Sequence, residues 1–227
     1  MCNMTDCVLS LLNKIKMEKT NEHRWIDLEN KALYGNYEEK LRISESLAYY
    51  HCAQSERILV EMLKDKERII RASACDSLCF SDSLNVLNHL IRMTSDTTVL
   101  VRGYAILSLG DVYCNMVSTE NTFSNLNCLV MKMFDKEQSE WLKICIARTA
   151  YLIGNLNFLY YLFDSINSKF YKNRCLAVNL LKDLELSSED KLKLISLLKR
   201  RQNIEKVYAV SECIKSYLET TERNDLK

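Results

Sequence analysis

The stretch VRGYAILSLG, residues 101–110, carries the pattern on which the fold of this chain depends. A cation, Arg102, is followed three residues later by the small residue Ala105 and seven residues later by Leu109. Positions with this spacing share one face of a helix, so the stretch predicts a helix with a narrow buried stripe.

A similar pattern returns along the chain at intervals of about thirty residues. Cations open helical stretches at six positions: Arg42, Arg71, Arg102, Lys143, Arg174 and Lys206. Their spacings are 29, 31, 41, 31 and 32 residues. A period of this length is typical of stacked helical hairpins, in which each hairpin buries its apolar stripe against the next. We expect each cation to mark the second helix of a hairpin.

The composition favours helices throughout. Proline is absent and there are only four glycines, so the chain has little of the turn chemistry that β-hairpins need. Amphipathic segments precede the cationic stretches, with apolar residues three and four positions apart. We therefore predict an all-α protein, in which Gly110 and Gly154 lie where helices end.

The repeating pattern predicts one domain over residues 1–227. Two amphipathic segments, Asp6–Met17 and Thr20–Tyr34, are expected to form an N-terminal helical cap within residues 1–37. Repeats are predicted over residues 38–219, and a frayed polar tail over residues 220–227.

The longest interval, between Arg102 and Lys143, predicts the one longer loop. Its additional residues fall around Asn115–Asn125, a polar stretch rich in Ser, Thr and Asn. The period resumes after this stretch, which is too short to separate two domains.

Residues 70–75 and 101–110 resemble HEAT repeats of the armadillo-like α-solenoid family. In that family the second helix opens with a valine–arginine pair, followed by small residues and leucine–glycine, and Asp96 stands where the family has an acidic residue. The resemblance implies a right-handed α-solenoid of about six helical hairpins that binds a partner on a concave face lined by second helices. It also implies that the six cations are structural, since the HEAT arginine usually contacts a nearby acidic side chain.

Charge and sorting signals restrict the function further. The formal net charge of +1 argues against broad neutralisation of nucleic-acid phosphates. No apolar run approaches the length of a membrane span, and Asp6–Met17 is too polar for a secretory signal. Ten cysteines without a Cys-x-x-Cys motif are expected as thiols packed in a reducing environment. We expect a cytoplasmic protein without membrane contact.

Residues for catalysis, cofactors or metals are not grouped in the sequence. Cys75 and Cys79 lie one helical turn apart, but no further ligand has a suitable spacing for zinc. His23, His51 and His89 are isolated, and the repeated His-Glu pairs of HEAT-like hydroxylases are missing. No Gly-rich phosphate loop is recognisable. These observations predict a protein that is not an enzyme and that has no catalytic residues, cofactor or metal.

Candidate binding residues come from an aromatic cluster and a basic segment. Tyr160 and Tyr161 point about 100° apart on one helix, so at least one of them is expected outside the core, as is Tyr171. From Lys169 to Lys206, ten Lys or Arg residues stand against five Asp or Glu residues, a net charge of +5. The basic residues are densest at Lys199, Arg200 and Arg201.

The main hypothesis is a protein-binding scaffold or adaptor with a partner of unknown identity. The alternative is a DNA-binding solenoid, including a diverged DNA glycosylase of the alkylation-repair type, whose arrangement Trp141 and Arg148 faintly resemble. A third hypothesis is a subunit or regulator whose partner is encoded elsewhere.

Overall fold

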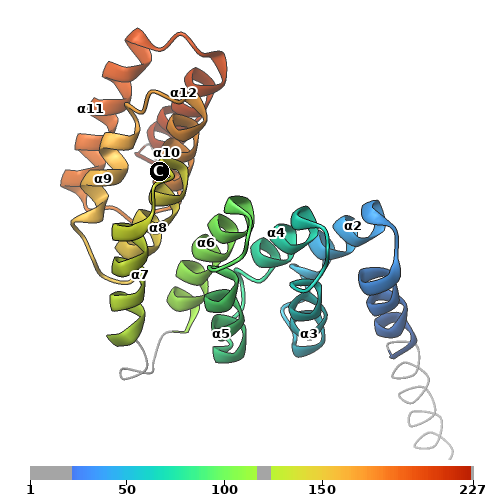
Figure 1. The fold of residues 1–227 in the computed structure, drawn as a ribbon. Helices are drawn as coiled ribbons and strands as arrows, with labels where there is room; N and C mark the ends of the chain where they lie inside the picture. The colour runs from blue at the N-terminus through green and yellow to red at the C-terminus, as the bar shows by residue number, and fades with distance from the viewer. Residues whose placement is uncertain (1–21, 117–123, 226–227) are drawn as a thin grey trace, which may run out of the picture. The chain divides into compact units, whose positions relative to one another are not determined.

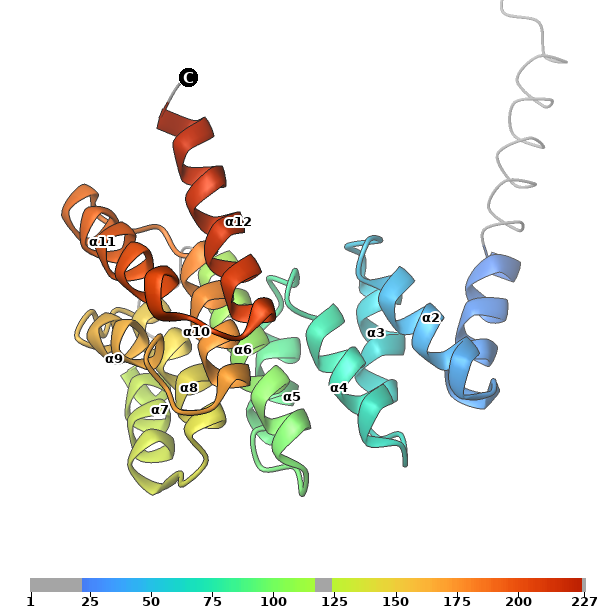
Figure 2. The same ribbon diagram turned by 90° about the horizontal axis from the view of Figure 1, so that it is seen from above.

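The computed structural model describes residues 22–116 and 124–225, and every secondary-structure element in these ranges is an α-helix (Figures 1 and 2). The prediction of an all-α protein is confirmed. The segment Asp6–Met17 and the central part of the expected loop, residues 117–123, lie outside the described residues.

The chain divides into two compact units, Met1–Ser108 and Leu109–Lys227. The first part of the chain contains helical residues 22–34, α2 (Tyr37–Leu47), α3 (Ala53–Met62), α4 (Arg68–Ser77), α5 (Leu84–Met93) and α6 (Val99–Asn115), which contains the unit boundary. The remainder contains α7 (Ser124–Lys136), α8 (Glu140–Leu152), α9 (Phe158–Ser165), α10 (Tyr171–Lys182), α11 (Ser188–Ile204) and α12 (Tyr208–Asp225). The single domain expected from the sequence stays a prediction.

Within each unit, helices pack against both their neighbours in sequence and the next helix but one. In the first unit α3 packs against α4, and α2 contacts α4. In the second unit α7 packs against α8, α9 against α10 and α11 against α12, while α10 contacts both α8 and α12. The second helices α2 and α4 therefore touch in the first unit, and in the second unit α10 touches both α8 and α12.

The stripe predicted from the sequence is buried in three of these second helices. Ala74, Ala105 and Ala177 are 0% exposed, and Leu78, Leu109 and Leu181 are at most 1% exposed. Small residues at these positions let neighbouring helices approach closely. The central helix α8 is buried almost along its whole length, which fits its contacts with three other helices.

Ion pairs connect a second helix to the turn that precedes the next second helix. We call them bridging ion pairs, and they join Lys40 to Asp65 (2.6 Å), Arg71 to Asp96 (2.8 Å) and Arg174 to Glu205 (2.8 Å). The partners are 25, 25 and 31 residues apart. Each carboxylate stands three residues before the first residue of a helix, and each cation is the fourth residue of a helix.

The carboxylates of these pairs also fix the turns in which they lie. Each one accepts a backbone N–H two residues further on: Asp65 from Glu67 (2.8 Å), Asp96 from Thr98 (2.8 Å) and Glu205 from Val207 (2.9 Å). One acidic side chain therefore both shapes a turn and holds it against the preceding pair of helices.

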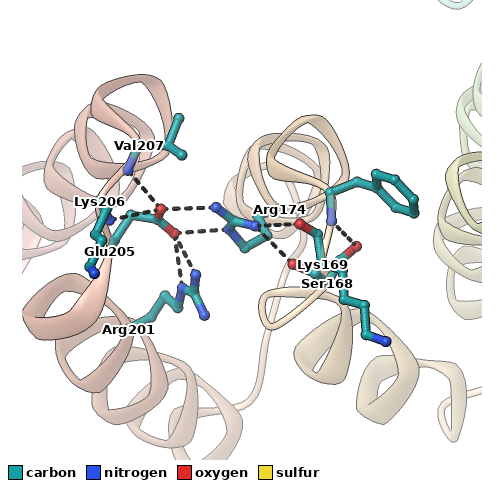
Figure 3. Close-up of polar contacts among 8 residues, drawn as sticks. Ser168, Lys169, Arg174, Arg201, Glu205, Lys206 and Val207 are labelled. Carbon is teal, nitrogen blue, oxygen red and sulfur yellow. Dashed lines mark hydrogen bonds and ion pairs between the residues drawn. The ribbon is translucent and has the colours of Figure 1, made fainter.

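The arginines donate, in addition, to backbone carbonyls of the turns that precede their own helices. Arg174 donates to the carbonyls of Ser168 (2.9 Å) and Lys169 (3.2 Å), as shown in Figure 3. Arg71 and Arg102 donate in the same way to carbonyls six residues earlier in the chain. The planar guanidinium has five N–H donors and can bind the carboxylate and the carbonyls together. The ammonium of Lys40 lacks this planar arrangement of donors.

Two of the six predicted structural cations are in the wrong register. The side chain of Arg42 is 80% exposed and lies 3.8 Å from Glu38 of its own helix. Because Asn36 caps α2, with Glu39 completing a capping box, the helix begins at Tyr37 and its fourth residue is Lys40. The true spacing from Lys40 to Arg71 is 31 residues.

Lys206 is exposed and lies before α12, which begins at Tyr208. The buried stripe of α12 passes through Val210 and Ile214, one residue beyond the predicted Ala209 and Cys213. The helix also extends to Asp225, so the predicted frayed tail is helical over most of its length.

At Lys143 the bridging pattern changes. The residue 25 positions later is Ser168, which has no charge, and the Lys143 ammonium lies 5.1 Å from the centre of the Phe134 ring instead. Ser168 retains the other role of the carboxylates, since its Oγ accepts the backbone N–H of Phe170 (3.2 Å).

The two glycines predicted at helix ends differ in their positions. Gly154 has φ 101° after α8, and the N–H groups of Gly154 and Asn155 donate to the carbonyls of Tyr151 and Ala150, which forms a Schellman motif. Gly110 instead lies inside α6, where a Cβ would be 3.0 Å from Thr149 Oγ1 of α8. Its role is therefore close helix packing.

Burial and hydrogen bonding have opposite effects on Glu205, whose side chain is 1% exposed. Burial alone raises the pKa of its carboxyl, but hydrogen bonds from Arg174, the Val207 N–H and Arg201 outweigh it and lower the pKa from 4.5 to about 2. The carboxylate is therefore held in its charged form (Figure 3).

We expect Arg174→Ala to lower the free energy of unfolding at neutral pH by about 3 kcal/mol, because it leaves a buried carboxylate with only Arg201 as its ionic partner. Since the pKa of Glu205 is lowered on folding, its contribution is full above pH 4.5 and is lost as the pH falls towards 2. The difference between variant and wild type should shrink in this range, as measured by urea unfolding. Equal stabilities at neutral pH would contradict the structural role, and Lys172→Ala on the exposed side of α10 is the control.

Ser168→Asp should supply the carboxylate that is missing opposite Lys143 and raise the free energy of unfolding by about 1 kcal/mol. Ser168→Asn, which can cap Phe170 without a charge, should give less. When Lys143→Gln is also present, the advantage of Asp over Asn at position 168 should disappear. Thermal unfolding of the two single variants at position 168 and of the same two changes combined with Lys143→Gln measures this coupling. Equal effects of Asp and Asn in the presence of Lys143 would refute it.

Candidate protein-binding groove

A groove of about 480 Å³ runs between α9 and α11 of the second unit, which lie side by side in both views (Figures 1 and 2). One wall comes from α9 and the turn after it: Tyr160, Phe163, Asp164 and Asn167. The other wall comes from α11: Lys193, Ser196, Leu197 and Arg200.

Each wall is a single helical face. The lining residues on both sides follow the spacing i, i+3, i+4, i+7, which places them on one stripe over about two turns, or roughly 10 Å. Residues of these two stripes are 26 or more positions apart in the sequence, and the packing of α9 and α11 around α10 and α12 brings them together.

The middle of the groove is apolar and its ends are polar. Phe163 is buried and Leu197 half-buried, so they form the floor, whereas the Tyr160 side chain at the rim is 61% exposed. The pKa of Lys193 is raised mainly by its hydrogen bond to Glu189 and in part by the nearby Tyr160, so Lys193 and Tyr160 lie at the same end. Arg200 and Asn167, the last residues of the two stripes, lie at the other.

Cations outnumber carboxylates in the lining. Lys193 and Arg200 stand on α11, and Asp164 is the one carboxylate among the lining residues. Lys193 is 2.8 Å from Glu189 and 3.8 Å from Asp190 of its own helix, but the Lys193 and Glu189 side chains are well exposed and the Asp190 contact is long, so these ion pairs are weak. Its ammonium can therefore turn to another carboxylate at little cost.

Of the predicted binding residues, the structure brings Tyr160 and Arg200 together in this groove. Lys199 is exposed on α11 beside it. Arg201 is half-buried and donates to Glu205 (2.8 Å), so its guanidinium supports the bridging ion pair of Arg174.

The other predicted binding residues lie elsewhere. Tyr161 packs edge-on against Phe134, with 5.0 Å between ring centres. Arg148 is buried and lies 2.7 Å from Asp111. Trp141 is half-buried on α8, and Tyr171 is exposed at the start of α10. None of these four lines the groove.

The sequence reasoning missed several surface features. It did not single out Lys193 or Leu197, and it included Phe163 only as one of a dense group of aromatic residues, although the i, i+3, i+4, i+7 spacing of each wall is visible in the sequence. It also missed the exposed Tyr49 and Phe80 near turns of the first unit; beside them, His51 adopts φ 42° and stacks edge-on against Phe80.

Only some of the thiols in the described residues are buried, and Cys2 and Cys7 lie outside those residues. Cys75 and Cys145 are in the core, and burial raises the pKa of Cys145 to about 12. Cys114 and Cys128, however, are exposed, contrary to the expectation of packed thiols. Within residues 22–116 and 124–225, no three His, Cys, Asp or Glu side chains converge as metal ligands do.

No helix of the described ranges is both long and apolar enough to cross a bilayer. No protein-family model matches the chain, and no curated protein is similar enough to be recognised as a relative.

The two adjacent tyrosines of α9 give a direct test of this assignment. Tyr160→Ala should leave the melting temperature almost unchanged, because the side chain is largely exposed. Tyr161→Ala should destabilise the protein by about 2–3 kcal/mol, because it removes a ring packed on Phe134. Calorimetry of both variants measures the difference, and similar losses would show that Tyr160 belongs to the core.

Proposed function

We propose that the chain is a non-enzymatic protein-binding scaffold with a HEAT-like α-solenoid fold, and that it binds its partner in the groove between α9 and α11. The observation that carries this proposal is the exposed Tyr160 beside an apolar floor, with Lys193 and Arg200 at the rim. Tyrosine and arginine are, with tryptophan, the residues enriched among the anchors of protein interfaces.

The arrangement of the groove fits a protein partner. A protein interface has an apolar centre and a polar rim, and here Phe163 and Leu197 are flanked by charged residues and Asn167. Tyr160 is largely exposed at the rim, so the groove is open to solvent on this side, which suits a side chain of a partner rather than an enclosed small molecule.

The HEAT-like part of the proposal is supported by the bridging ion pairs. They recur at equivalent positions of α2, α4 and α10, and each ties one pair of helices to the next. The resemblance to HEAT repeats implied binding on the second helices of the pairs. The groove is instead lined by α9 and α11, which are first helices of their pairs, so we propose that the partner contacts first helices.

A DNA-binding solenoid has weaker support. Arg148, on which that alternative partly rested, is buried against Asp111, and Asp164 would face phosphates in the groove. We also propose a cytoplasmic location, consistent with exposed free thiols that persist in a reducing compartment.

The test is affinity capture from native extract followed by cross-linking and mass spectrometry. A specific partner should be cross-linked to α9 or α11 by the wild type and lost with Tyr160→Ala, whose fold should be intact. Tyr49→Ala, which removes an even more exposed tyrosine from the first unit, should retain the partner.

Two results would overturn the proposal. One is a partner that is captured equally by Tyr160→Ala and cross-linked away from α9 and α11. The other is tight, salt-sensitive binding of duplex DNA that Tyr160→Ala leaves unchanged.

A further inference from the structure

We infer that the groove between α9 and α11 takes an acidic amphipathic helix, which inserts apolar side chains over Phe163 and Leu197 and presents carboxylates to Lys193 and Arg200. This inference rests on the proposed function and names the chemistry of the partner.

The shape of the groove indicates a helix. Both walls are helical stripes with the spacing i, i+3, i+4, i+7, and they run over about two turns. A helix laid between two helices packs its ridges into such a groove, and its own anchors then repeat with the same spacing. An extended chain would place alternate side chains away from the floor.

The charges indicate an acidic partner. The cations of the α11 wall stand seven residues apart, one near each end of the groove. Carboxylates at positions i and i+7 of a bound helix, with leucines at i+3 and i+4 between them, match the two cations and the apolar floor. Lys199 adds a further exposed positive charge beside Arg200.

Asp164 makes the match directional. It is the only carboxylate in the lining and stands on the α9 wall, next to Phe163. An acidic helix must therefore turn its carboxylates towards α11 and keep the side that faces Asp164 uncharged or basic. A polyanion with charge on all sides, such as duplex DNA, cannot avoid Asp164 in this way.

The probes are synthetic, fluorescein-labelled helical peptides of about four turns. The first carries Glu at i and i+7 with Leu at i+3 and i+4, and the second and third replace both Glu residues by Gln or by Lys. Fluorescence anisotropy with the full chain should show the Glu peptide binding about tenfold tighter than the Gln peptide, and the Lys peptide binding weakest. The preference should decrease at high salt.

Variants of the chain assign the effect to the groove. Arg200→Glu should abolish the preference for Glu over Gln, while Lys199→Glu, a matched change on the neighbouring residue outside the lining, should largely retain it. Asp164→Asn should tighten binding of the Glu peptide about twofold to fivefold. All three positions are exposed, so melting temperatures should stay close to that of the wild type.

The inference is overturned if Glu and Gln peptides bind equally, or if Lys199→Glu and Arg200→Glu have equal effects. It is also overturned if duplex DNA displaces the Glu peptide and its binding depends on Arg200. Binding of the Gln peptide that is lost with Tyr160→Ala would overturn the acidic partner but retain the protein-binding groove. If no peptide binds and capture of the native partner is unaffected by Tyr160→Ala, both proposals fail.

Discussion

The carboxylate in the turn before a second helix is the constraint on which the helix packing depends. Such a turn exposes backbone N–H groups at the start of the helix, and these groups need acceptors. Asp65, Asp96 and Glu205 satisfy one of them and, with the same side chain, bind a cation from the preceding pair of helices. The chain therefore couples the shape of each turn to the position of its neighbour, and substitution of one residue affects both.

The sequence pattern predicted the cations of the bridging ion pairs only where the cation, the small residue and the leucine all occur at their expected positions. Arg71 and Arg174 were found because cation, small residue and leucine follow one another at fixed spacing. The sequence pattern placed the structural cation at Arg42 instead of Lys40, an error of two residues. The capping box of Asn36 and Glu39 decides where α2 begins, and with this start the fourth residue of the helix is Lys40. Similarly, Gly110 was expected to end a helix, but the approach of Thr149 that explains it comes from a residue far away in the sequence.

The groove was harder to predict than the fold. Tyr160 and Arg200 were predicted as individual residues, because adjacent tyrosines on one helix and a run of basic residues can be recognised in the sequence. Their juxtaposition requires the packing of α9 and α11 around α10 and α12, which sequence periodicity does not specify. Conversely, Arg148 and Tyr161 are residue types common in interfaces, but inside the second unit Arg148 pairs with Asp111 and Tyr161 packs against Phe134. Residue type alone therefore could not separate residues that line the groove from residues that pack inside the unit.

The uncharged Ser168 has a mechanical consequence. Elements joined in series deform most where the connection is most compliant, and the step from α8 to α10 has a hydroxyl where others have a carboxylate. The next residue towards α9 is Asn167, which lines the groove. We therefore expect elastic strain applied to the second unit to concentrate beside the groove that we propose as the binding site. The width of this groove should change more readily than the packing of α10 and α12, which the bridging ion pair of Arg174 joins.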